Sequence, residues 1–291
     1  MYNERPSTNR KSYLLWIILL LILIIGFNQR GTILAQPLLH QGNFLLESWR
    51  FRDFDLIKSP QALVYYTPSQ KEEATLISKE AEDILSSFAK HYNFKPRRPL
   101  PIFLFPDRQR MEEHFTTRNS HNANGIYTAG AVYILDPAAW NMSFPSATQQ
   151  PSKWARLFHK EGPLTHEITH YYLDRTTGGN YPLWYTEAFA QWVEYKELDY
   201  ERVPPTQPLP KYVLYTYDEL YNRFDQLPNQ DLAYRQSFLF LRWIIDSHGE
   251  KLNKQLQEHL AQGKTFNEAW KRTYGETPKR SYDKWLYQIG R

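Results

Sequence analysis

The stretch "GPLTHEITHYYLD", residues 162–174, places two histidines four positions apart, with a glutamate directly after the first. Pro163 suits the first turn of a helix, because an N–H at that position would have no partner within the helix. The glycines at 178–179 can end that helix. We therefore predict a mostly buried helix in which apolar and tyrosine side chains surround a narrow stripe of ionisable groups.

His166 and His170 lie on one face of this helix, because each residue advances the helix by about 100°. A buried ionisable stripe is costly unless something satisfies it, and a zinc ion would do so. Two neutral imidazoles can reach one ion at about 2.0–2.1 Å, while Glu167 can point at a water beside the metal and act as its base. The motif alone leaves open a helix that carries two satisfied histidines.

A second helix follows in "YPLWYTEAFAQWVEY", residues 181–195. The Gly-Gly-Asn turn before it allows the two helices to pack antiparallel. Glu187, Gln191 and Glu194 form one polar stripe at spacings of four and three. Glu187 is thereby placed to act as the third zinc ligand, which leaves the fourth position to water. The alternative for Glu187 is an ordinary solvated face.

The combination of "EGPLTHEITHYYLDR" with "YPLWYTEAFAQWVE" resembles the gluzincin metallopeptidases, specifically the bacterial peptidase MA-like group. The resemblance implies an α+β, zincin-like fold of two lobes. The N-terminal α/β lobe would hold a mixed sheet, and the C-terminal lobe would be mostly helical. It also implies bound zinc (Zn2+), with His166, His170 and Glu187 as ligands and Glu167 as the catalytic base.

Two positions depart from the pattern of that family. The family usually has glycine where this chain has Ala188, and alanine is the smallest alternative. Many relatives carry an aspartate where this chain has Gln191. Gln191 can hydrogen-bond a ligand imidazole but lacks the charge that raises ligand basicity. Asp174, one turn after His170, matches a common position for a residue that supports a ligand.

The order of elements before the motif is that of an α/β lobe. Strands are predicted in "QALVYYTP" (61–68), in "PLPIFLFP" (99–106) and in "GIYTAGAVYILDP" (125–137), the last as a hairpin that turns at Gly130. The prolines at the ends of the second strand suggest a position near an edge or a terminus. The third could be an edge strand that pairs with an extended substrate, or an ordinary sheet strand.

Helical patterns prevail after about residue 140. They are predicted to start near Trp184, Asp231 and Glu250, and a last one covers Phe266–Tyr274. The proline-rich segment 203–210 is expected to be a loop between helices.

The N-terminus has the layout of a targeting signal, and the alternative is a buried core helix. Residues 12–29 are uncharged and largely apolar, and Arg10 and Lys11 precede them, which favours a cytoplasmic N-terminus. We expect the chain to enter the membrane through residues 13–27, either as an uncleaved signal anchor or as a signal peptide cleaved after residues 33–35. Both alternatives place the rest of the chain outside the cytoplasm, at the cell membrane or secreted.

Three regions are therefore expected. Residues 1–35 form a cytoplasmic tip with the anchor or signal peptide, residues 36–60 form a linker with a short helical piece, and residues 61–291 form the peptidase MA-like domain. Nothing in the sequence indicates the oligomeric state.

Composition limits the alternatives. The chain of 291 residues has no cysteine, which excludes disulfides, cysteine-ligated zinc and a cysteine nucleophile. The net charge of +4 comes without a basic cluster dense enough for a nucleic-acid groove, so we expect no nucleic-acid partner.

The expected activity is hydrolysis of peptide bonds in a peptide or protein substrate, in which Glu167 moves the proton. A Gly-x-Met-x-Asn element for a free amino terminus is absent, which favours an endopeptidase. Tyr234 is the first candidate for the donor to the oxyanion, and Tyr217 and His248 are alternatives. The competing hypothesis is a membrane-tethered binding or assembly protein that keeps the fold without turnover. A third hypothesis, a protein that binds cell-wall glycans through aromatic side chains, would rest on the amino-acid composition alone.

Overall fold

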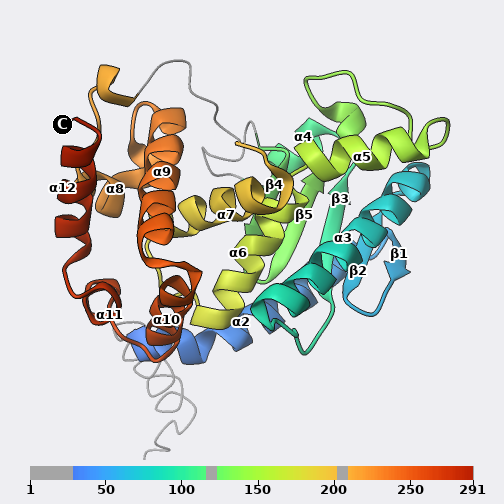
Figure 1. Ribbon diagram of the computed structural model, residues 1–291. Coiled ribbons are helices and arrows are strands. Elements are labelled where there is room, and N and C mark those ends of the chain that lie inside the picture. Colours follow the sequence, from blue (N-terminus) through green and yellow to red (C-terminus); the bar gives the residue numbers. More distant parts are fainter. Residues whose placement is uncertain (1–28, 116–122, 202–208, 291) are drawn as a thin grey trace, which may run out of the picture.

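The computed structural model describes residues 29–115, 123–201 and 209–290. A lobe built on a β-sheet lies beside a lobe of helices, with α6 (Leu164–Thr177) and α7 (Leu183–Leu198) between them (Figure 1). The sheet has the order β1-β2-β3-β5-β4. Its strands are β1 (Asp55–Lys58), β2 (Ala62–Tyr66), β3 (Leu100–Phe105), β4 (Gly125–Thr128) and β5 (Ala131–Leu135). The inner three are parallel and the two edge strands antiparallel, so the predicted mixed sheet is confirmed.

The second predicted strand, β3, is at the centre of the sheet, so of the two alternatives, an edge or a terminus, the edge is wrong. All six of its residues are buried, as in a parallel strand covered on both faces. Pro99 precedes the strand and Pro106 follows it, so neither interrupts the ladder, whereas Pro101 is the second residue of β3 and pairs in register with Leu63 of β2. The continuous apolar run was therefore the better signal than the prolines.

The hairpin of β4 and β5 turns at Ala129 and Gly130, as predicted, and both residues have positive φ angles. Such a turn matches the twist of the strands that it joins. β4 is thereby left at the edge of the described sheet, next to α6.

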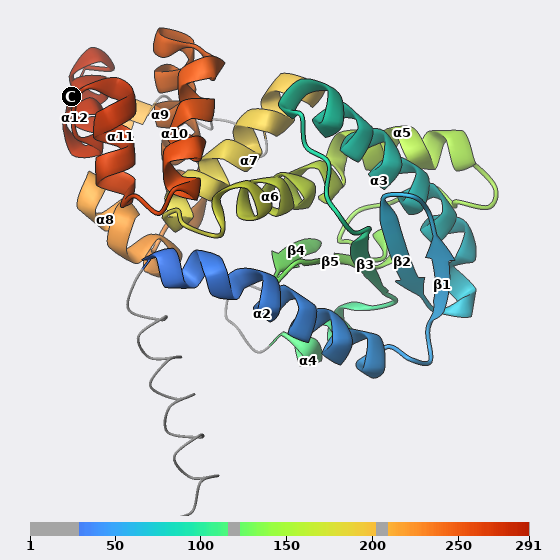
Figure 2. The same ribbon diagram turned by 90° about the horizontal axis from the view of Figure 1, so that it is seen from below.

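Helices cover both faces of the sheet (Figure 2). One face carries α3 (Lys71–Tyr92), α5 (Pro151–Glu161) and α6 (Leu164–Thr177), and the other carries α2 (Gln29–Arg50) and α4 (Arg108–His114). α3 buries its apolar stripe, with Ile77, Ala81 and Leu85 fully enclosed. This burial of one helical stripe closes the core of the first lobe.

Residues 36–60, expected to be a linker, instead contain most of α2 and all of β1. Phe51, just after α2, packs its ring 4.7 Å from that of Phe103 in β3. Glu47 of α2 is buried and lies 3.2 Å from the Nε2 atom of His114. Helical periodicity was hard to detect here because α2 also carries apolar residues on its outer face, and because Pro37 lies within it.

The expected membrane segment, residues 13–27, lies outside the described residues. Across the part of the chain that the structure describes, no helix combines the length and the apolar character needed to cross a membrane.

The second lobe is helical, as predicted. It contains α7 (Leu183–Leu198), α8 (Tyr217–Arg223), α9 (Gln230–His248), α10 (Glu250–Ala261), α11 (Phe266–Tyr274) and α12 (Pro278–Gln288). Trp184 of α7 is nearly fully enclosed among the rings of Phe240 and Phe266. The short helix α8 and the last helix α12 were not predicted. Most of the expected loop at 203–210 lies outside the described residues.

The helix that carries the motif, α6, lies at the junction of the lobes. Twelve of its fourteen residues are buried, so its polar side chains must find partners inside the protein. The helix before it ends at Gly162, where a Cβ would collide with the Phe158 carbonyl oxygen. Gly178 ends α6 in a left-handed conformation, as predicted from the glycine pair.

Candidate metal centre

The predicted ligands meet at the crossing of α6 and α7. The ligand atoms of His166, His170 and Glu187 all lie within 4.8 Å of one another. His166 Nε2 is 3.3 Å from Glu187 Oε2, and His170 Nε2 is 3.7 Å from Glu187 Oε1. Bonds of about 2.0–2.2 Å at tetrahedral angles would separate ligand atoms by roughly 3.3–3.6 Å. The donor set and its spacing therefore fit a zinc ion.

Antiparallel packing of the two helices produces this arrangement. The first histidine of α6 contacts the far part of α7, where His166 Nδ1 donates to Glu194 Oε2 at 2.9 Å. The second contacts the beginning of α7, where His170 Nδ1 lies 2.7 Å from Thr186 Oγ1. Each hydrogen bond occupies Nδ1 and leaves Nε2 toward Glu187. Such outer partners fix the tautomer and the ring orientation of a ligand histidine.

Gln191 does not take the role expected for it. Its Nε2 atom donates to the backbone carbonyls of Glu187 and Tyr234, at 3.3 and 3.2 Å. The residue that supports His166 is Glu194, which is only 1 % exposed. Seven residues separate Glu187 from Glu194, almost two full turns, so both face α6. Glu194, one turn after Gln191 in α7, therefore supplies the negative charge that the glutamine lacks.

Glu167 lies at the wall of the same cavity as the three ligands. This cavity, of about 320 Å3, is lined by the His–His–Glu cluster, Glu167, Tyr234 and part of β4. Gly125 of β4 approaches α6 closely, since a Cβ there would lie 2.5 Å from Pro163 Cβ and 3.1 Å from Glu167 Cγ. The absence of a side chain at Gly125 lets the edge strand run directly beside the cluster.

Asp174 supports a different group of side chains from the one expected. The partner of His170 Nδ1 is Thr186, whereas the Asp174 carboxylate accepts hydrogen bonds from the Tyr127 hydroxyl and the Gln36 amide. His40 Nε2 lies 2.9 Å from Asp174 Oδ2. Two of these partners, Gln36 and His40, come from α2, and no motif in the sequence pointed to them.

Tyr127 of β4 lies beside a candidate ligand, since its ring stacks with a centroid distance of 6.5 Å from that of His170. Burial raises the pKa of Tyr127 well above its usual value, and the negative charge of Asp174 adds to the effect. The hydroxyl therefore stays protonated and can keep donating to Asp174. Tyr127 also lines a second cavity on the other side of His170, together with Gln36 and His40.

Of the three candidates for the oxyanion donor, only Tyr234 lines the cavity of the cluster. Tyr217 is buried in the helical lobe, with its ring 6.0 Å from that of Trp184. His248 is exposed at the end of α9, where its ring contacts that of Tyr274. The structure thus places Tyr234 beside the candidate ligands and the other two elsewhere.

Comparison with known proteins assigns the chain to a family. The profile of the peptidase MA superfamily matches residues 80–289, which is most of the chain. The chain belongs to the peptidase MA superfamily. No curated protein matches the chain. The peptidase MA match includes both helices of the His–His–Glu cluster, whereas α2, β1 and β2 precede it.

Proposed function

We propose that this protein is a zinc-dependent metallopeptidase that hydrolyses peptide bonds, most simply as an endopeptidase. The observation that carries the proposal is the shared cavity of the His–His–Glu cluster and Glu167, beside the edge strand β4. A glutamate next to the first histidine is dispensable for holding a metal but is needed to move a proton. Its presence at the cavity wall favours turnover over binding alone.

His166, His170 and Glu187 would hold the ion. Zinc bound there would supply a Lewis acid that polarises the peptide carbonyl and acidifies a water. Glu167 would take the proton of the attacking water and deliver it to the leaving amine. Tyr234 would donate a hydrogen bond to the oxygen on which negative charge develops.

The substrate is proposed to be an extended peptide segment that lies along β4. The backbone groups on the outer side of an edge strand can pair with such a segment, which gives affinity with little choice of sequence. Gly125 supports this placement, because it brings the strand to the wall that carries Glu167. A scissile bond held by β4 would then lie beside the proton acceptor.

The protein is also proposed to be membrane-anchored, with residues 13–27 in the bilayer and the peptidase domain outside the cytoplasm. Support for an anchor over a cleaved signal comes from α2. Cleavage after Ala35 would cut this helix, which is continuous from residue 29. It would also remove Ile33, whose side chain packs directly against Gly178 at the end of α6.

The test uses the full chain purified in detergent. We expect about one zinc per chain by elemental analysis and cleavage of casein. Glu167→Gln should retain zinc and lose about 10²- to 10⁴-fold in rate, the usual contribution of a general acid–base group. Glu258→Gln, an exposed glutamate of α10, is the matched control and should match wild type. Stoichiometric zinc without cleavage by wild type would favour the non-catalytic binding protein, and absence of zinc would refute the metal site.

A further inference from the structure

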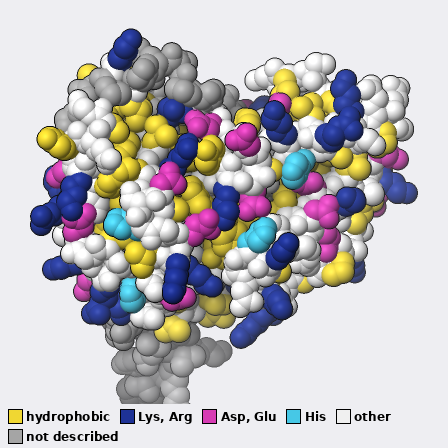
Figure 3. All heavy atoms as spheres, viewed as in Figure 1, with side chains coloured by type: hydrophobic (Ala, Val, Ile, Leu, Met, Phe, Trp, Pro, Cys, Tyr) yellow, Lys and Arg dark blue, Asp and Glu magenta, His cyan; other side chains and the backbone are white. Residues whose placement is uncertain are grey.

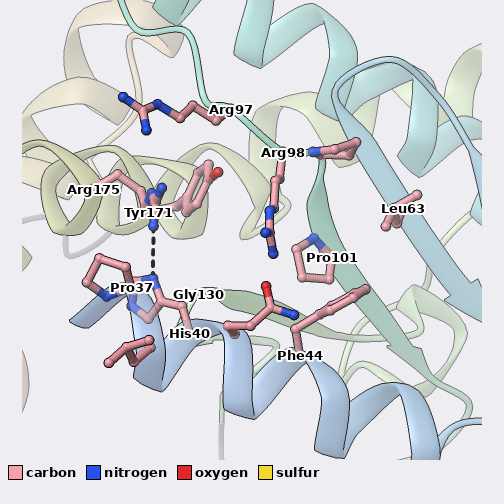
Figure 4. A pocket seen from close by; sticks show the side chains of 13 residues that line it. Pro37, His40, Phe44, Leu63, Arg97, Arg98, Pro101, Gly130, Tyr171 and Arg175 are labelled. Carbon is pink, nitrogen blue, oxygen red and sulfur yellow. Dashed lines mark hydrogen bonds between the residues drawn. The ribbon is translucent and has the colours of Figure 1, made fainter. Parts of the chain in front are cut away.

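A separate cavity of about 590 Å3 lies between α2, the end of α6 and the loop that leads into β3 (Figure 4). Arg98 points down from this loop toward α2, and Arg97 extends along the upper rim. Arg175 of α6 reaches the same space, where it lies 3.4 Å from His40 Nδ1. Three guanidinium groups therefore face one cavity.

The charge of this cavity is not balanced locally. Among the described residues that line it, none is acidic. Arg97 and Arg98 are exposed, and neither forms an ion pair with a described residue. On the face of the molecule shown in Figure 3, by contrast, basic side chains are interspersed with acidic ones. Guanidinium groups pair with phosphate oxygens through two parallel hydrogen bonds, so the unbalanced charge indicates an anionic ligand.

The remaining wall of the cavity is mostly apolar. Its apolar part is formed by Pro37, Leu38, Phe44, Leu63, Pro99 and Pro101, and Gln41 and Tyr171 are among its polar residues. A cavity of this volume and lining suits a ligand of several heavy groups with an apolar part, rather than an inorganic anion alone. The ligand should therefore be amphiphilic.

The outer face of α2 carries an exposed apolar stripe that begins at this cavity. Leu34, Leu38, Leu45 and Trp49 are spaced by four, seven and four residues, so they lie on one side of the helix. They are 74, 76, 61 and 63 % exposed. Leu38 belongs both to the stripe and to the cavity wall. Leucine and tryptophan on one face of a helix are typical of a helix that lies in the surface of a bilayer.

Chain connectivity places this stripe close to a membrane. The uncharged segment of residues 12–29 ends where α2 begins. We propose that the arginine cavity binds the phosphate head group of an anionic phospholipid, and that the acyl chains of this lipid follow the apolar stripe of α2. The inference rests on the proposed membrane attachment but not on the proposed peptidase activity.

Such a lipid would orient the peptidase site. His40 separates the arginine cavity from the cavity beside His170, because it contacts Arg175 on one side and Asp174 on the other. A head group bound at Arg175 would hold the membrane surface alongside α2. The cleft would then be held near the bilayer, within reach of peptide segments that emerge from it.

The test is native mass spectrometry of the full chain in detergent, titrated with phosphatidylglycerol or phosphatidylcholine. We expect one phosphatidylglycerol per chain, bound at least about tenfold tighter than phosphatidylcholine. Arg97→Gln/Arg98→Gln should weaken phosphatidylglycerol binding about tenfold or more, because charge-assisted hydrogen bonds are lost. Lys271→Gln/Arg272→Gln removes the same charge from the exposed surface of α11 and should bind as wild type.

Two further arms identify the source of the phosphate. Leu34→Gln/Leu38→Gln should weaken phosphatidylglycerol binding without lowering the melting temperature. Glycerol phosphate and inorganic phosphate should compete only at far higher concentrations. Equal affinity for inorganic phosphate, or equal lipid binding by the arginine variant and its control, would overturn the proposal. Lipid binding by Glu167→Gln should be unchanged, which separates this result from the test of peptidase activity.

Discussion

The helices α6 and α2 meet at Asp174. Both depart from the usual rule that apolar side chains are buried and ionisable ones exposed, but in opposite ways. α6 encloses ionisable side chains, since His166, Glu167 and Asp174 are all buried. α2 exposes large apolar ones, among them Leu38 and Trp49. Both arrangements are costly unless a partner compensates. In our proposals the compensating partners differ. The ionisable side chains of α6 have partners inside the protein and would also face a zinc ion, whereas the exposed apolar face of α2 would contact a lipid surface.

The largest effect should come from breaking the ligand set of α6 and α7. Glu187→Ala removes one of three ligands. Because loss of even an outer hydrogen-bond partner typically weakens metal binding 10- to 100-fold, zinc affinity should fall more than about 100-fold. Competition with a chromophoric chelator measures this. Glu258→Ala on the exposed surface of α10 is the control, and an unchanged zinc affinity in Glu187→Ala would contradict the proposed site.

The next effect tests which residue of α7 supports the ligands. Glu194→Gln keeps a hydrogen-bond acceptor for His166 Nδ1 but removes its charge, so zinc affinity should fall about 10- to 100-fold while the fold survives. Gln191→Ala should change the affinity less than about threefold, because its amide contacts only backbone carbonyls in the described structure. A larger loss of zinc affinity in Gln191→Ala than in Glu194→Gln would instead support Gln191 as the residue that supports a ligand histidine.

The close approach of Gly125 in β4 to Pro163 can be tested by its effect on the stability of the protein. Gly125→Ala places a Cβ 2.5 Å from Pro163 Cβ, and overpacking of this kind costs about 1–3 kcal/mol. The melting temperature and the cleavage rate should both fall. Gly42→Ala in α2 meets nothing within 4 Å and should stabilise the protein by about 0.5–1 kcal/mol. Differential scanning calorimetry of both variants tests this, and similar shifts in the two would refute the close approach of β4 to α6.

The smallest effect on stability is expected on the outer face of α2. Leu45→Gln/Trp49→Gln should change the free energy of unfolding by less than about 0.5 kcal/mol per site, since these side chains are mostly in solvent. The same variant should associate less with phosphatidylglycerol vesicles in flotation. A marked loss of stability would show instead that this face is packed against protein.

The parts of the molecule that the sequence predicted are those encoded locally. His166, His170 and Glu187 fall within 22 residues, and two helices joined by a short turn suffice to bring them together. The partner of His166 was within reach of the same reasoning, because Glu194 lies on the stripe of Glu187. Four of the five strands were also accessible, because they lie in short apolar runs bounded by turns. The exception is β1, a four-residue strand with a charged residue at each end, inside the segment expected to be a linker.

The contribution of α2 could not be predicted in this way. Gln36 and Asp174 are 138 positions apart, and no spacing rule relates them. Apolar residues on the outer face of α2 masked its helical period, and the preceding apolar segment suggested a linker after an anchor. Contacts between residues far apart in the sequence, and apolar side chains that face outward, leave little periodic signal in the sequence.

The shared carboxylate of Asp174 has a mechanical consequence. It holds Gln36 and His40 of α2 on one side and the Tyr127 wall of the cleft on the other. Lifting α2 away would remove Gln36 and His40 from this buried carboxylate, so the position of α2 and the Tyr127 wall of the cleft are coupled. By reciprocity, a ligand that steadied Tyr127 would make α2 harder to pull away by the same free energy. In the proposed membrane-anchored peptidase, tension on the anchor and binding of a peptide would therefore act on one equilibrium.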